Sequence, residues 1–373
     1  MNSDIILTPK LSECPVLSPC TIQQHQWGDG LLIRTPNWLG DAVMIFPALV
    51  MLKRILPEHC GLFIACPKGL APLFDEMKEV GHVIPLEDAH AFPNAEERES
   101  FRELCAGATV LFNNSFRDAL ALRMLGKRNL YGVKARNRGF LMRSNWRLPK
   151  RKSGELNPYH QACVYLAMAK AMGADDWDGS MPQFVFQEEE QMKNDPQYAS
   201  MFDPRKPLLT IAPGAAYGDA KRWDSENFHK VADWWIREKQ GVVAVIGTGK
   251  EACIAQQVAD GLPQNSVFQL AGKTSLKQLM IILRVSACCL ANDSGTMHLA
   301  ASLGTAGVAL FGSTDPAATC PVVPRNNWRM LYHKLPCSPC FKRDCPKGNK
   351  ECFQALTPEL VQQAMDQVVD FVK

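Results

Sequence analysis

The sequence lacks a hydrophobic run long enough to cross a membrane as a helix. Its most apolar stretch, residues 42–52, is shorter than the roughly 20 residues that a spanning helix needs, and it contains Pro47. The N-terminal residues also lack the basic start and the continuous apolar run of a signal peptide. We therefore expect a cytoplasmic protein whose fourteen cysteines are reduced thiols rather than a disulfide framework.

The sequence also lacks a strong excess of charge and two common nucleotide-binding motifs. Its formal net charge is only +3, which argues against a protein that coats nucleic acid. No G-x-G-x-x-G opens a helix, as a dinucleotide-binding site requires. The run IGTGKEA at residues 246–252 lacks the upstream glycine and the Ser or Thr after lysine that a P-loop requires. Neither an NAD enzyme nor an NTPase is therefore supported.

What the sequence does contain is a repeated alternation of short apolar runs and longer amphipathic ones. This alternation predicts an α/β fold, with parallel sheets covered by helices. It occupies two stretches separated by a polar segment, residues 187–207. The chain has 373 residues, 46% of them hydrophobic, which is enough for two domains with their own cores. We therefore expect two Rossmann-like domains that face each other across a ligand-binding cleft.

The same pattern predicts the domain boundaries. Residues 1–29 carry three prolines and no clear periodicity, so they are interpreted as a loose N-terminal extension. The two Rossmann-like domains are expected at residues 30–195 and 196–355. The last segment, residues 356–373, has the pattern of an amphipathic helix with Thr357 as its N-cap.

Three loops join the end of a predicted strand to the start of a predicted helix, and each carries candidate functional residues. In RTPNWLGDAVM, residues 34–44, Gly40 allows a tight turn and Asp41 stands at or just before the helix N-terminus. On one interpretation, Asp41 is simply the N-cap of this helix and has no role in catalysis. Alternatively, its carboxylate could act as a general base at the edge of the cleft.

The other two loops suit anion binding. In APGAAYGDAKRW, residues 212–223, small residues let backbone amides approach a ligand, and Lys221 and Arg222 supply positive charge. A solvated turn is the alternative for this loop. In NDSGTMHLAASLG, residues 292–304, the free N–H groups at the helix start favour a diphosphate. His298 lies one turn inside that helix, where a lone histidine is more often structural than catalytic.

These motifs together resemble those of a known family. The runs IRTPNWLGDAVM, FNNSFRDAL, APGAAYGDAKRW and NDSGTMHLAASLGTAGVALFGSTDP are similar to those of the ADP-heptose:lipopolysaccharide heptosyltransferases, glycosyltransferase family 9, and most similar to heptosyltransferase II. The resemblance extends from about Leu31 to the C-terminus. It implies a GT-B fold and an inverting transfer of L-glycero-D-manno-heptose from ADP-heptose to the inner-core heptose of lipopolysaccharide. It also implies that the C-terminal helix returns toward the N-terminal domain.

The resemblance assigns roles to individual residues. Asp41 matches the family's proposed catalytic base, and Lys221 matches the lysine that contacts the donor diphosphate. Lys221 would also assist catalysis by stabilising the charge on the departing diphosphate. Glu251 would contact the nucleotide ribose. The donor-binding residues are expected to be Gly214, Lys221, Arg222, Glu251, Asp293, Ser294, Gly295, Thr296 and His298. The acceptor-binding residues are expected to be Asn114, Ser115, Arg117, Arg136 and Arg138.

A strongly basic run occupies residues 119–154, with eleven Lys and Arg residues and no Asp or Glu. A solvated basic face is one interpretation of such a run. Because the resemblance puts a phosphorylated, Kdo-bearing lipid A acceptor on this half of the chain, we favour contact with that acceptor and with the anionic inner face of the inner membrane. Nucleic-acid binding would depend on this run alone, and we expect no such partner.

Four cysteines near the C-terminus have the spacing C-x2-C-x4-C-x6-C and are Cys337, Cys340, Cys345 and Cys352. Four thiolates at this density could hold a structural Zn²⁺, and the spacing also permits an iron–sulfur cluster. The alternative is a loop of reduced cysteines. The resemblance implies that the transfer reaction requires no metal or other cofactor.

Two rival functions are compatible with the same motifs. One is a related GT-B transferase with another nucleotide-sugar donor, which would prefer a UDP or GDP sugar. The other is a sugar-nucleotide-binding protein that has kept the fold and lost turnover. The presence of both Asp41 and Lys221 argues against the second.

Overall fold

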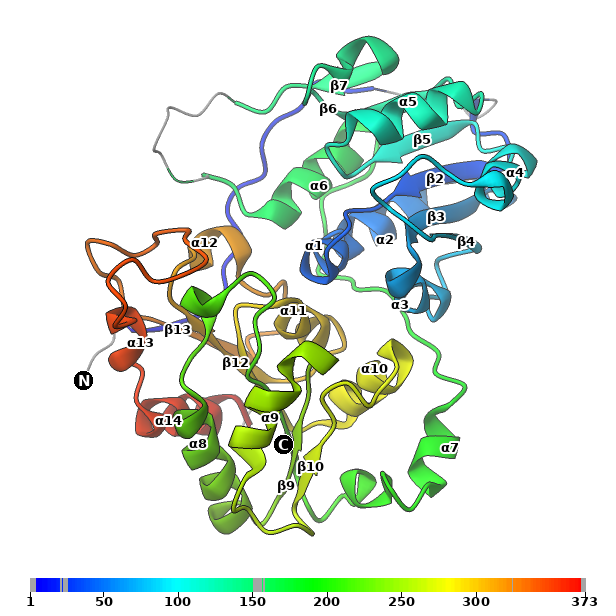
Figure 1. Ribbon diagram of the computed structural model, residues 1–373. Coiled ribbons are helices and arrows are strands. Elements are labelled where there is room, and N and C mark those ends of the chain that lie inside the picture. Colours follow the sequence, from blue (N-terminus) through cyan, green and yellow to red (C-terminus); the bar gives the residue numbers. More distant parts are fainter. Residues whose placement is uncertain are drawn as a thin grey trace. The chain divides into compact units, whose positions relative to one another are not determined.

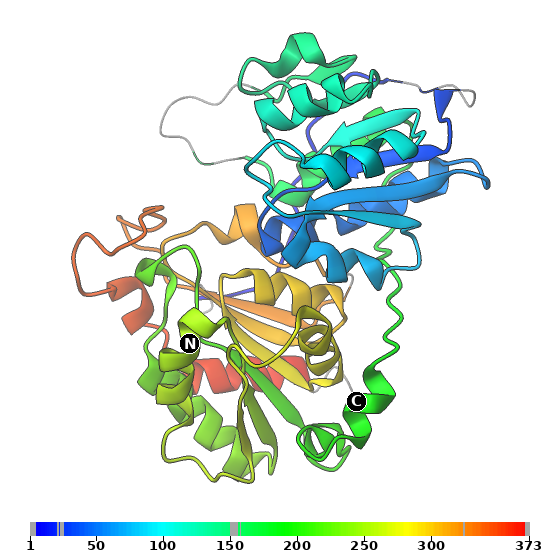
Figure 2. The ribbon, with the colours of Figure 1, turned by 45° about the vertical axis from the view of Figure 1, so that its right-hand side comes forward.

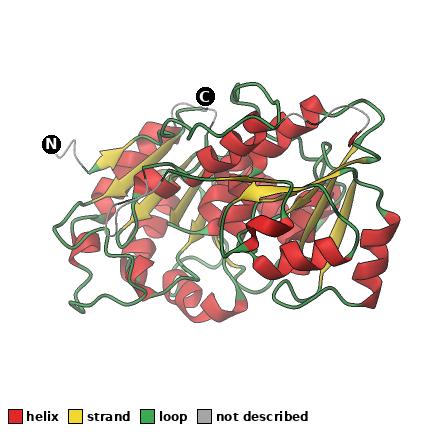
Figure 3. Cartoon of the chain, turned by 90° about the horizontal axis from the view of Figure 1, so that it is seen from above, coloured by secondary structure: helices red, strands yellow, loops and turns green. Residues whose placement is uncertain are grey.

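The computed structural model forms two compact units. It describes residues 5–20, 22, 26–149, 156, 158–323 and 325–369. The N-terminal unit consists of the described residues of 12–185, and the C-terminal unit combines those of 1–11 and 186–373. Each unit contains one β-sheet whose strands are flanked by helices (Figures 1 and 3). The prediction of two α/β units with parallel sheets is confirmed.

The N-terminal unit contains a six-stranded parallel sheet in the order β4-β3-β2-β5-β6-β7. This is the order of a doubly wound sheet, in which the chain leaves the central strand pair in opposite directions. The strands are β2 (Gly30–Arg34), β3 (Gly61–Pro67), β4 (His82–Leu86), β5 (Ala108–Leu111), β6 (Leu130–Val133) and β7 (Ser144–Trp146). The helices are α1 (Leu39–Met44), α2 (Phe46–Ile55), α3 (Ala71–Asp75), α4 (Ala95–Glu103), α5 (Phe116–Met124) and α6 (Gln161–Ala171).

The central strands of this sheet are the most apolar ones. Every residue of β2 and β5 is buried, as expected for strands covered on both faces. Gly30 begins β2 because a Cβ at this position would lie 1.9 Å from the carbonyl oxygen of Gly61. Helix α2 is buried from Phe46 to Leu52 and packs against α6, so the most apolar stretch of the sequence is an interior helix.

The C-terminal unit contains a seven-stranded sheet in the order β1-β13-β12-β11-β8-β9-β10. Apart from the antiparallel β1, its order is again that of a doubly wound sheet. The strands are β1 (Ile6–Leu7), β8 (Leu208–Ala212), β9 (Val242–Val245), β10 (Val267–Gln269), β11 (Cys288–Asn292), β12 (Gly307–Phe311) and β13 (Trp328–Tyr332). The helices are α7 (Glu189–Asn194), α8 (Ser225–Glu238), α9 (Ala252–Ala259), α10 (Leu276–Val285), α11 (Gly295–Ser302), α12 (Pro316–Thr319), α13 (Glu351–Gln354) and α14 (Pro358–Val369).

The N-terminal segment differs from the sequence-based prediction, and the C-terminal helix packs within its own unit. Ile6 and Leu7 form β1, which pairs with Leu331 and Met330 of β13, so this part of the N-terminal segment is an edge strand of the C-terminal sheet rather than a loose extension. Helix α14 packs against α8, β12 and β13 of its own unit (Figures 1 and 2). Its apolar face is buried in the core of the C-terminal unit. The expected return of this helix toward the N-terminal domain stays a prediction.

The boundary between the units also lies earlier than predicted. The C-terminal unit begins at Phe186, whereas the sequence pattern placed the boundary between residues 195 and 196. The polar segment 187–207 is not a plain linker, because it contains α7, which packs against α10. Phe186 itself contacts the Arg284 guanidinium of α10, 4.9 Å from the ring centroid. Tertiary packing of a few apolar residues therefore outweighs the polar composition of this segment.

Candidate active site

Among the candidate residues, Arg136 and Arg138 follow β6, and Glu251 follows β9. The other candidate catalytic, donor-binding and acceptor-binding residues follow the two strands at which the order of each sheet reverses. These strands are β2 and β5 in the N-terminal unit and β8 and β11 in the C-terminal unit. Loops that leave such a strand pair run to opposite faces of the sheet, so a crevice forms outside the carboxyl ends of the strands. Ligands of doubly wound sheets bind there, which makes these loops the candidate half-sites of the two units.

Asp41 lies in the first turn of α1, which follows β2. The N-cap position belongs to Trp38, whose side chain makes no capping hydrogen bond, so the interpretation of Asp41 as an N-cap is wrong. A carboxylate in the first turn is nevertheless favoured by the helix dipole. Burial, followed by the negative charge of Asp41, raises the pKa of Tyr165 on α6, which places the carboxylate within electrostatic range of that ring. The Asp41 side chain is half-buried.

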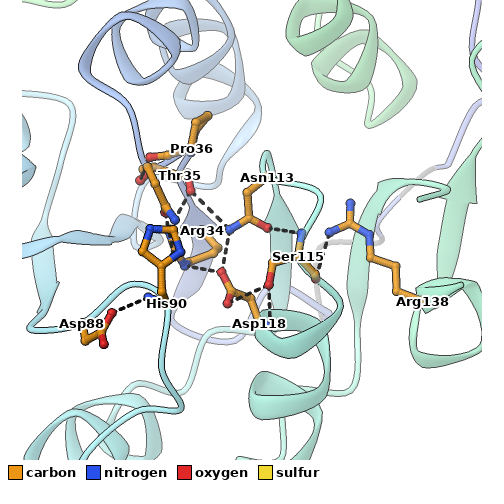
Figure 4. A network of polar contacts seen from close by, with 10 residues as sticks. Arg34, Thr35, Pro36, Asp88, His90, Asn113, Ser115, Asp118 and Arg138 are labelled. Carbon is orange, nitrogen blue, oxygen red and sulfur yellow. Dashed lines mark hydrogen bonds and ion pairs between the residues drawn. The ribbon is translucent and has the colours of Figure 1, made fainter. Parts of the chain in front are cut away.

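A buried ion pair supports the loop that leads to Asp41. Arg34 at the end of β2 pairs with Asp118 of α5, with 2.8 Å between Nε and Oδ2, and the two side chains are 2% and 8% exposed. Figure 4 shows Asp118 between Arg34 and Ser115. The other guanidinium nitrogens of Arg34 donate to the Thr35 carbonyl oxygen at 2.7 Å and to Asn37 Oδ1 at 2.9 Å. Arg34 therefore ties the backbone before α1 to α5.

The same carboxylate organises the loop after β5. Asn113 Nδ2 donates to Asp118 Oδ2 at 2.6 Å, and Ser115 Oγ donates to Asp118 Oδ1 at 3.0 Å. Ser115 is also the N-cap of α5, because its Oγ accepts from the Asp118 backbone N–H. One buried carboxylate thus fixes both loops of the N-terminal half-site (Figure 4).

The predicted acceptor-binding residues divide into surface and interior groups. Asn114 and Arg136 are exposed, while Ser115 and Arg117 are half-buried. Arg138 is fully buried, and its guanidinium donates to the backbone carbonyls of Val133 and Ser115. Burial lowers the pKa of Arg138 to about 10. Arg138 therefore supports the loops of the half-site from inside and does not face an acceptor.

The basic run is likewise not one uniform surface. Lys127 is buried and donates to the Leu104 carbonyl oxygen. Two residues of the basic run, Lys127 and Arg138, are therefore buried in the interior of the unit. Exposed members include Arg123, Arg128, Lys134, Arg136, Arg143 and Arg147. Lys150, Arg151 and Lys152 lie outside the described residues. The exposed aromatic rings of Phe116 and Phe140 lie in the same region, with centroids 6.2 Å apart.

In the C-terminal unit, Lys221 and Asp293 form an ion pair. Lys221 ends a 3-10 turn (Asp219–Lys221) in the loop after β8, and Asp293 directly follows β11. Their Nζ and Oδ2 atoms lie 2.6 Å apart, and the side chains are 15% and 5% exposed. Thr314, in the loop after β12, donates to the same carboxylate oxygen at 2.5 Å. An ammonium has three donors, so Lys221 can bind Asp293 and still donate to an anion.

Asn292, at the end of β11, fixes the backbone of the loop after β8. Its Nδ2 donates to the Pro213 carbonyl oxygen at 2.8 Å, and its Oδ1 accepts from the Trp223 backbone N–H at 3.1 Å. The Asn292 side chain is fully buried. The side-chain amide of Asn292 therefore holds both ends of the loop that carries Lys221.

Glu251 and Gly214 meet at the same edge of the sheet. A Cβ on Gly214 would lie 1.8 Å from Glu251 Oε1, so only glycine permits this approach. The other carboxylate oxygen of Glu251 accepts from Thr248 in a capping box, at 2.8 Å from the backbone nitrogen. Glu251 therefore lies next to Gly214, and one of its carboxylate oxygens is used in the capping box. Its expected contact with the nucleotide ribose stays a prediction.

The start of α11 offers polar groups next to Asp293. Ser294 is the N-cap residue, yet its side chain makes no capping hydrogen bond. Among the described residues, Ser294 Oγ is one of the buried side-chain atoms without a hydrogen-bond partner. Gly295 and Thr296 form the first turn, and His298 is buried within the helix at 5% exposure. An unpartnered hydroxyl beside free helix N–H groups is suited to an anionic ligand.

Several residues of the half-sites were absent from the sequence-based prediction. They are Arg34, Asn113, Asp118, Asn292 and Thr314, and all follow or end a central strand or begin the next helix. Arg34 and Asn292 end strands as lone polar residues after apolar runs, which was a usable signal. Asp118 resembles an ordinary first-turn acid of a helix, and only the fold reveals its partner.

The cysteines and the helices set limits on metal binding and membrane spanning in the described residues. Within the described parts of the chain, all fourteen cysteines are free, and no group of three or more His, Cys, Asp or Glu side chains stands in position to hold a metal ion. Across those same residues, no helix is both long and apolar enough to span a bilayer.

Comparisons with known proteins agree with the geometry of the two units. The family model of glycosyltransferase family 9 (heptosyltransferase) matches residues 98–351. The lipooligosaccharide heptosyltransferase 2 of Haemophilus ducreyi is 30% identical over 356 residues, which cover 91% of this chain and 99% of the relative.

Two solved structures are similar in fold. The Escherichia coli ADP-heptose LPS heptosyltransferase II has a TM-score of 0.73 at 23% identity, and the match covers 91% of this chain and 98% of that one. The iron-containing dodecameric glycosyltransferase TibC from enterotoxigenic Escherichia coli has a TM-score of 0.51 at 14% identity, with coverage of 96% and 79%. At these identities the likeness concerns the fold alone.

Two doubly wound sheets, each with polar side chains at its ligand-binding edge, form the GT-B fold. A fold of this class supports many donors and acceptors, so the family must come from the sequence match. The chain belongs to glycosyltransferase family 9, the heptosyltransferase family.

Proposed function

We propose that this enzyme transfers L-glycero-D-manno-heptose from ADP-heptose to the inner-core heptose of a Kdo-bearing lipid A, with inversion at the anomeric carbon. The observation that carries the proposal is the pair of Lys221 and Asp293 beside the start of α11, which is suited to a sugar-linked diphosphate. The family match and the relatives named for lipopolysaccharide heptose transfer support the same donor and acceptor.

Asp41 is the proposed general base. Its carboxylate would take the proton of an acceptor hydroxyl, whose oxygen then attacks the anomeric carbon from the face opposite ADP. The buried Arg34–Asp118 pair supports this role, because it fixes the backbone from which α1 starts. Asn114, Arg117 and Arg136 remain proposed acceptor contacts at the same edge of the N-terminal sheet.

Lys221 and the amides at the start of α11 are proposed to stabilise the departing ADP. Bond breaking leaves negative charge on the diphosphate, and donors already aimed at that position stabilise the transition state more than the bound substrate. Arg222 and Ser294 would contribute further donors, and Glu251 would accept from the ribose. In this proposal the transfer proceeds through these side chains and requires no cofactor.

The direct test is a turnover assay with purified protein, ADP-heptose and a Kdo-lipid A acceptor that carries one heptose. We expect acceptor-dependent ADP release and a product heavier by one heptose in mass spectrometry. Tight binding of ADP-heptose without release would contradict the proposed acceptor. Release from a UDP or GDP sugar in preference to ADP-heptose would favour the related transferase with another donor.

Replacement of Lys221 by alanine should lower kcat/KM by roughly 10²- to 10³-fold, because one preorganised donor to the leaving group is lost. Steady-state kinetics with ADP-heptose and calorimetric titration with ADP measure the effect. Lys230→Ala is the matched control, since Lys230 is also paired to a carboxylate, Glu226 at 2.8 Å, but lies exposed on α8. A Lys221→Ala enzyme with kinetics equal to those of Lys230→Ala would remove Lys221 from the mechanism.

We further propose that the enzyme works on the cytoplasmic face of the inner membrane. The exposed arginines near Phe116 and Phe140 would contact anionic headgroups there, at roughly 1 kcal/mol for each basic residue. The relatives' lipid-linked acceptors are consistent with such a location.

The combined change Arg128→Ala, Arg143→Ala and Arg147→Ala should weaken binding to vesicles rich in phosphatidylglycerol by about 100-fold. Sedimentation of protein with vesicles at low and high salt measures it. The combined change Lys78→Ala, Arg98→Ala and Arg102→Ala removes three exposed charges elsewhere on the same unit and should have a smaller effect. Equal losses for both triple variants would indicate a nonspecific charge effect and contradict a docking surface.

A further inference from the structure

The four C-terminal cysteines come together around one cavity of the C-terminal unit. Cys337 and Cys340 lie in the loop after β13, Cys345 lies in the following turn, and Cys352 lies in α13. All four line the same cavity, together with Ala220 of the loop after β8. Each is half-buried and free of a disulfide.

The turn around Cys345 is arranged to hold a thiolate. Backbone N–H groups of residues 347–350 form hydrogen bonds with the Cys345 side chain. Lys347 also forms a side-chain hydrogen bond with Cys337. Backbone amides and an ammonium stabilise the deprotonated form of a cysteine, which is the form that binds metals.

The cysteine segment is also attached to the loop that carries Lys221. The Ala220 backbone N–H donates to the Arg343 carbonyl oxygen at 2.8 Å, and Lys350 Nζ donates to the Arg222 carbonyl oxygen at 3.2 Å. The residues on both sides of Lys221 are therefore held by residues that lie between the cysteines. A Cβ on Gly218 would lie 2.4 Å from the Arg343 carbonyl oxygen, so glycine is needed for this close contact.

An aromatic ring makes a second connection between the two segments. Tyr217 Oη donates to the Phe341 carbonyl oxygen at 2.9 Å. The Tyr217 ring centroid lies 5.3 Å from Lys221 Nζ and 5.4 Å from Arg343 Cζ. A displacement of the cysteine segment would therefore move both the backbone and the cation–π contact of Lys221.

We propose that Cys337, Cys340, Cys345 and Cys352 bind one thiophilic divalent ion, Zn²⁺ or Fe²⁺, and that this site holds the donor loop around Lys221 in place. Four sulfur ligands suit either ion. Four metal–sulfur bonds form, four thiol protons pass to solvent, and the metal keeps its charge. The resulting net charge is −2; Lys347 and Lys350 line the same cavity, and Lys342 and Arg343 lie between Cys340 and Cys345 in the sequence.

The structure shows the four sulfurs around the cavity but not yet converged on one point, since no three ligands among the described residues are in position for an ion. Metal binding would therefore draw the segment 337–352 together. Because that segment holds Ala220 and Arg222, an ordered metal site would order the donor loop. This second part of the proposal rests on the donor site of the proposed function, whereas the metal site does not.

The metal site is tested by metal analysis of the full-length protein, purified without chelators under reducing conditions. We expect about one zinc or iron per chain by mass spectrometry of the metal, and the identity of the element distinguishes the two ions. Cobalt added to the metal-free protein should give thiolate-to-metal charge-transfer bands and intense bands of tetrahedral Co²⁺. Cys345→Ser and Cys352→Ser should lose the metal and these bands, while Cys253→Ser, exposed on α9, should retain both.

The connection to the donor loop is tested with ADP as the probe. Removal of the metal should weaken ADP binding about five- to tenfold, because the loop must then be ordered on binding. Hydrogen exchange of the amides of residues 214–224 should become faster in the same sample. Two results would overturn the metal site. One is a protein that contains neither zinc nor iron and gives no cobalt bands. The other is a disulfide among the four cysteines, with no metal uptake after reduction. If the protein binds metal but removal of the metal changes neither the ADP affinity nor the hydrogen exchange of residues 214–224, the proposed effect of the metal on the donor loop is wrong.

Discussion

Asp41→Asn should lower acceptor-dependent turnover by roughly 10²- to 10⁴-fold, the range expected when a positioned general base is lost. Asparagine keeps the size and polarity of the side chain in the first turn of α1 but cannot accept the acceptor's proton. The affinity for ADP-heptose should stay unchanged, because the donor-binding side chains belong to the C-terminal unit. Stopped assays of ADP release, with calorimetry of donor binding beside them, measure both quantities.

Asp29→Asn is the matched control for this change. Asp29 directly precedes β2, so it lies at the amino end of the strand whose carboxyl end leads to Asp41. The control should retain wild-type turnover because the amino end of the sheet is remote from the ligand-binding edge. If Asp41→Asn keeps turnover within about tenfold of Asp29→Asn, a different residue or water must accept the proton.

The α/β fold and the positions of the half-sites were largely predictable from the chain. Buried parallel strands leave short apolar runs, and Gly40, Gly214 and Gly295 lie in the segments that follow them. Each loop with a predicted site residue does follow a strand. What the pattern could not provide was strand order, because pairing between distant strands depends on packing of the whole sheet. The reversal points at β2/β5 and β8/β11 therefore came only from the structure.

The interior polar contacts were also hidden from the sequence. Arg34 and Asp118 are far apart in the chain, so the sequence does not show that they form a pair, and Asp118 looks like a common surface charge until the fold buries it. Arg138 was interpreted as an acceptor contact because basic runs are usually exposed, yet its guanidinium satisfies backbone carbonyls in the interior. Similarly, Ile6 and Leu7 carry too little pattern to predict a strand, and they become one because the edge of β13 offers hydrogen-bond partners.

Asp118→Ala should lower the free energy of unfolding of the N-terminal unit by about 3–5 kcal/mol, because it leaves the buried Arg34 guanidinium without its carboxylate. Burial already lowers the pKa of Arg34, which shows that its charged form is costly in this environment. Asn113 and Ser115 would lose a hydrogen-bond acceptor in the same change. Hydrogen exchange of the buried amides of β2 and β5 at increasing urea reports on this unit alone and measures the loss.

Asp178→Ala provides a matched comparison, because Asp178 also pairs with an arginine, Arg54, at 2.9 Å, but both side chains are about half exposed. An exposed pair of this kind contributes little, so this variant should have a free energy of unfolding close to that of the wild type.

The double variant Arg34→Met, Asp118→Leu should recover much of the stability by removing the unpaired charge, yet it should not recover turnover. Turnover needs the Thr35 carbonyl and the Asn37 side chain held by Arg34, since they set the start of α1 and hence the position of Asp41. Equal unfolding of Asp118→Ala and Asp178→Ala would mean that burial of the pair does not stabilise the fold, and that the loop before Asp41 is held by other contacts.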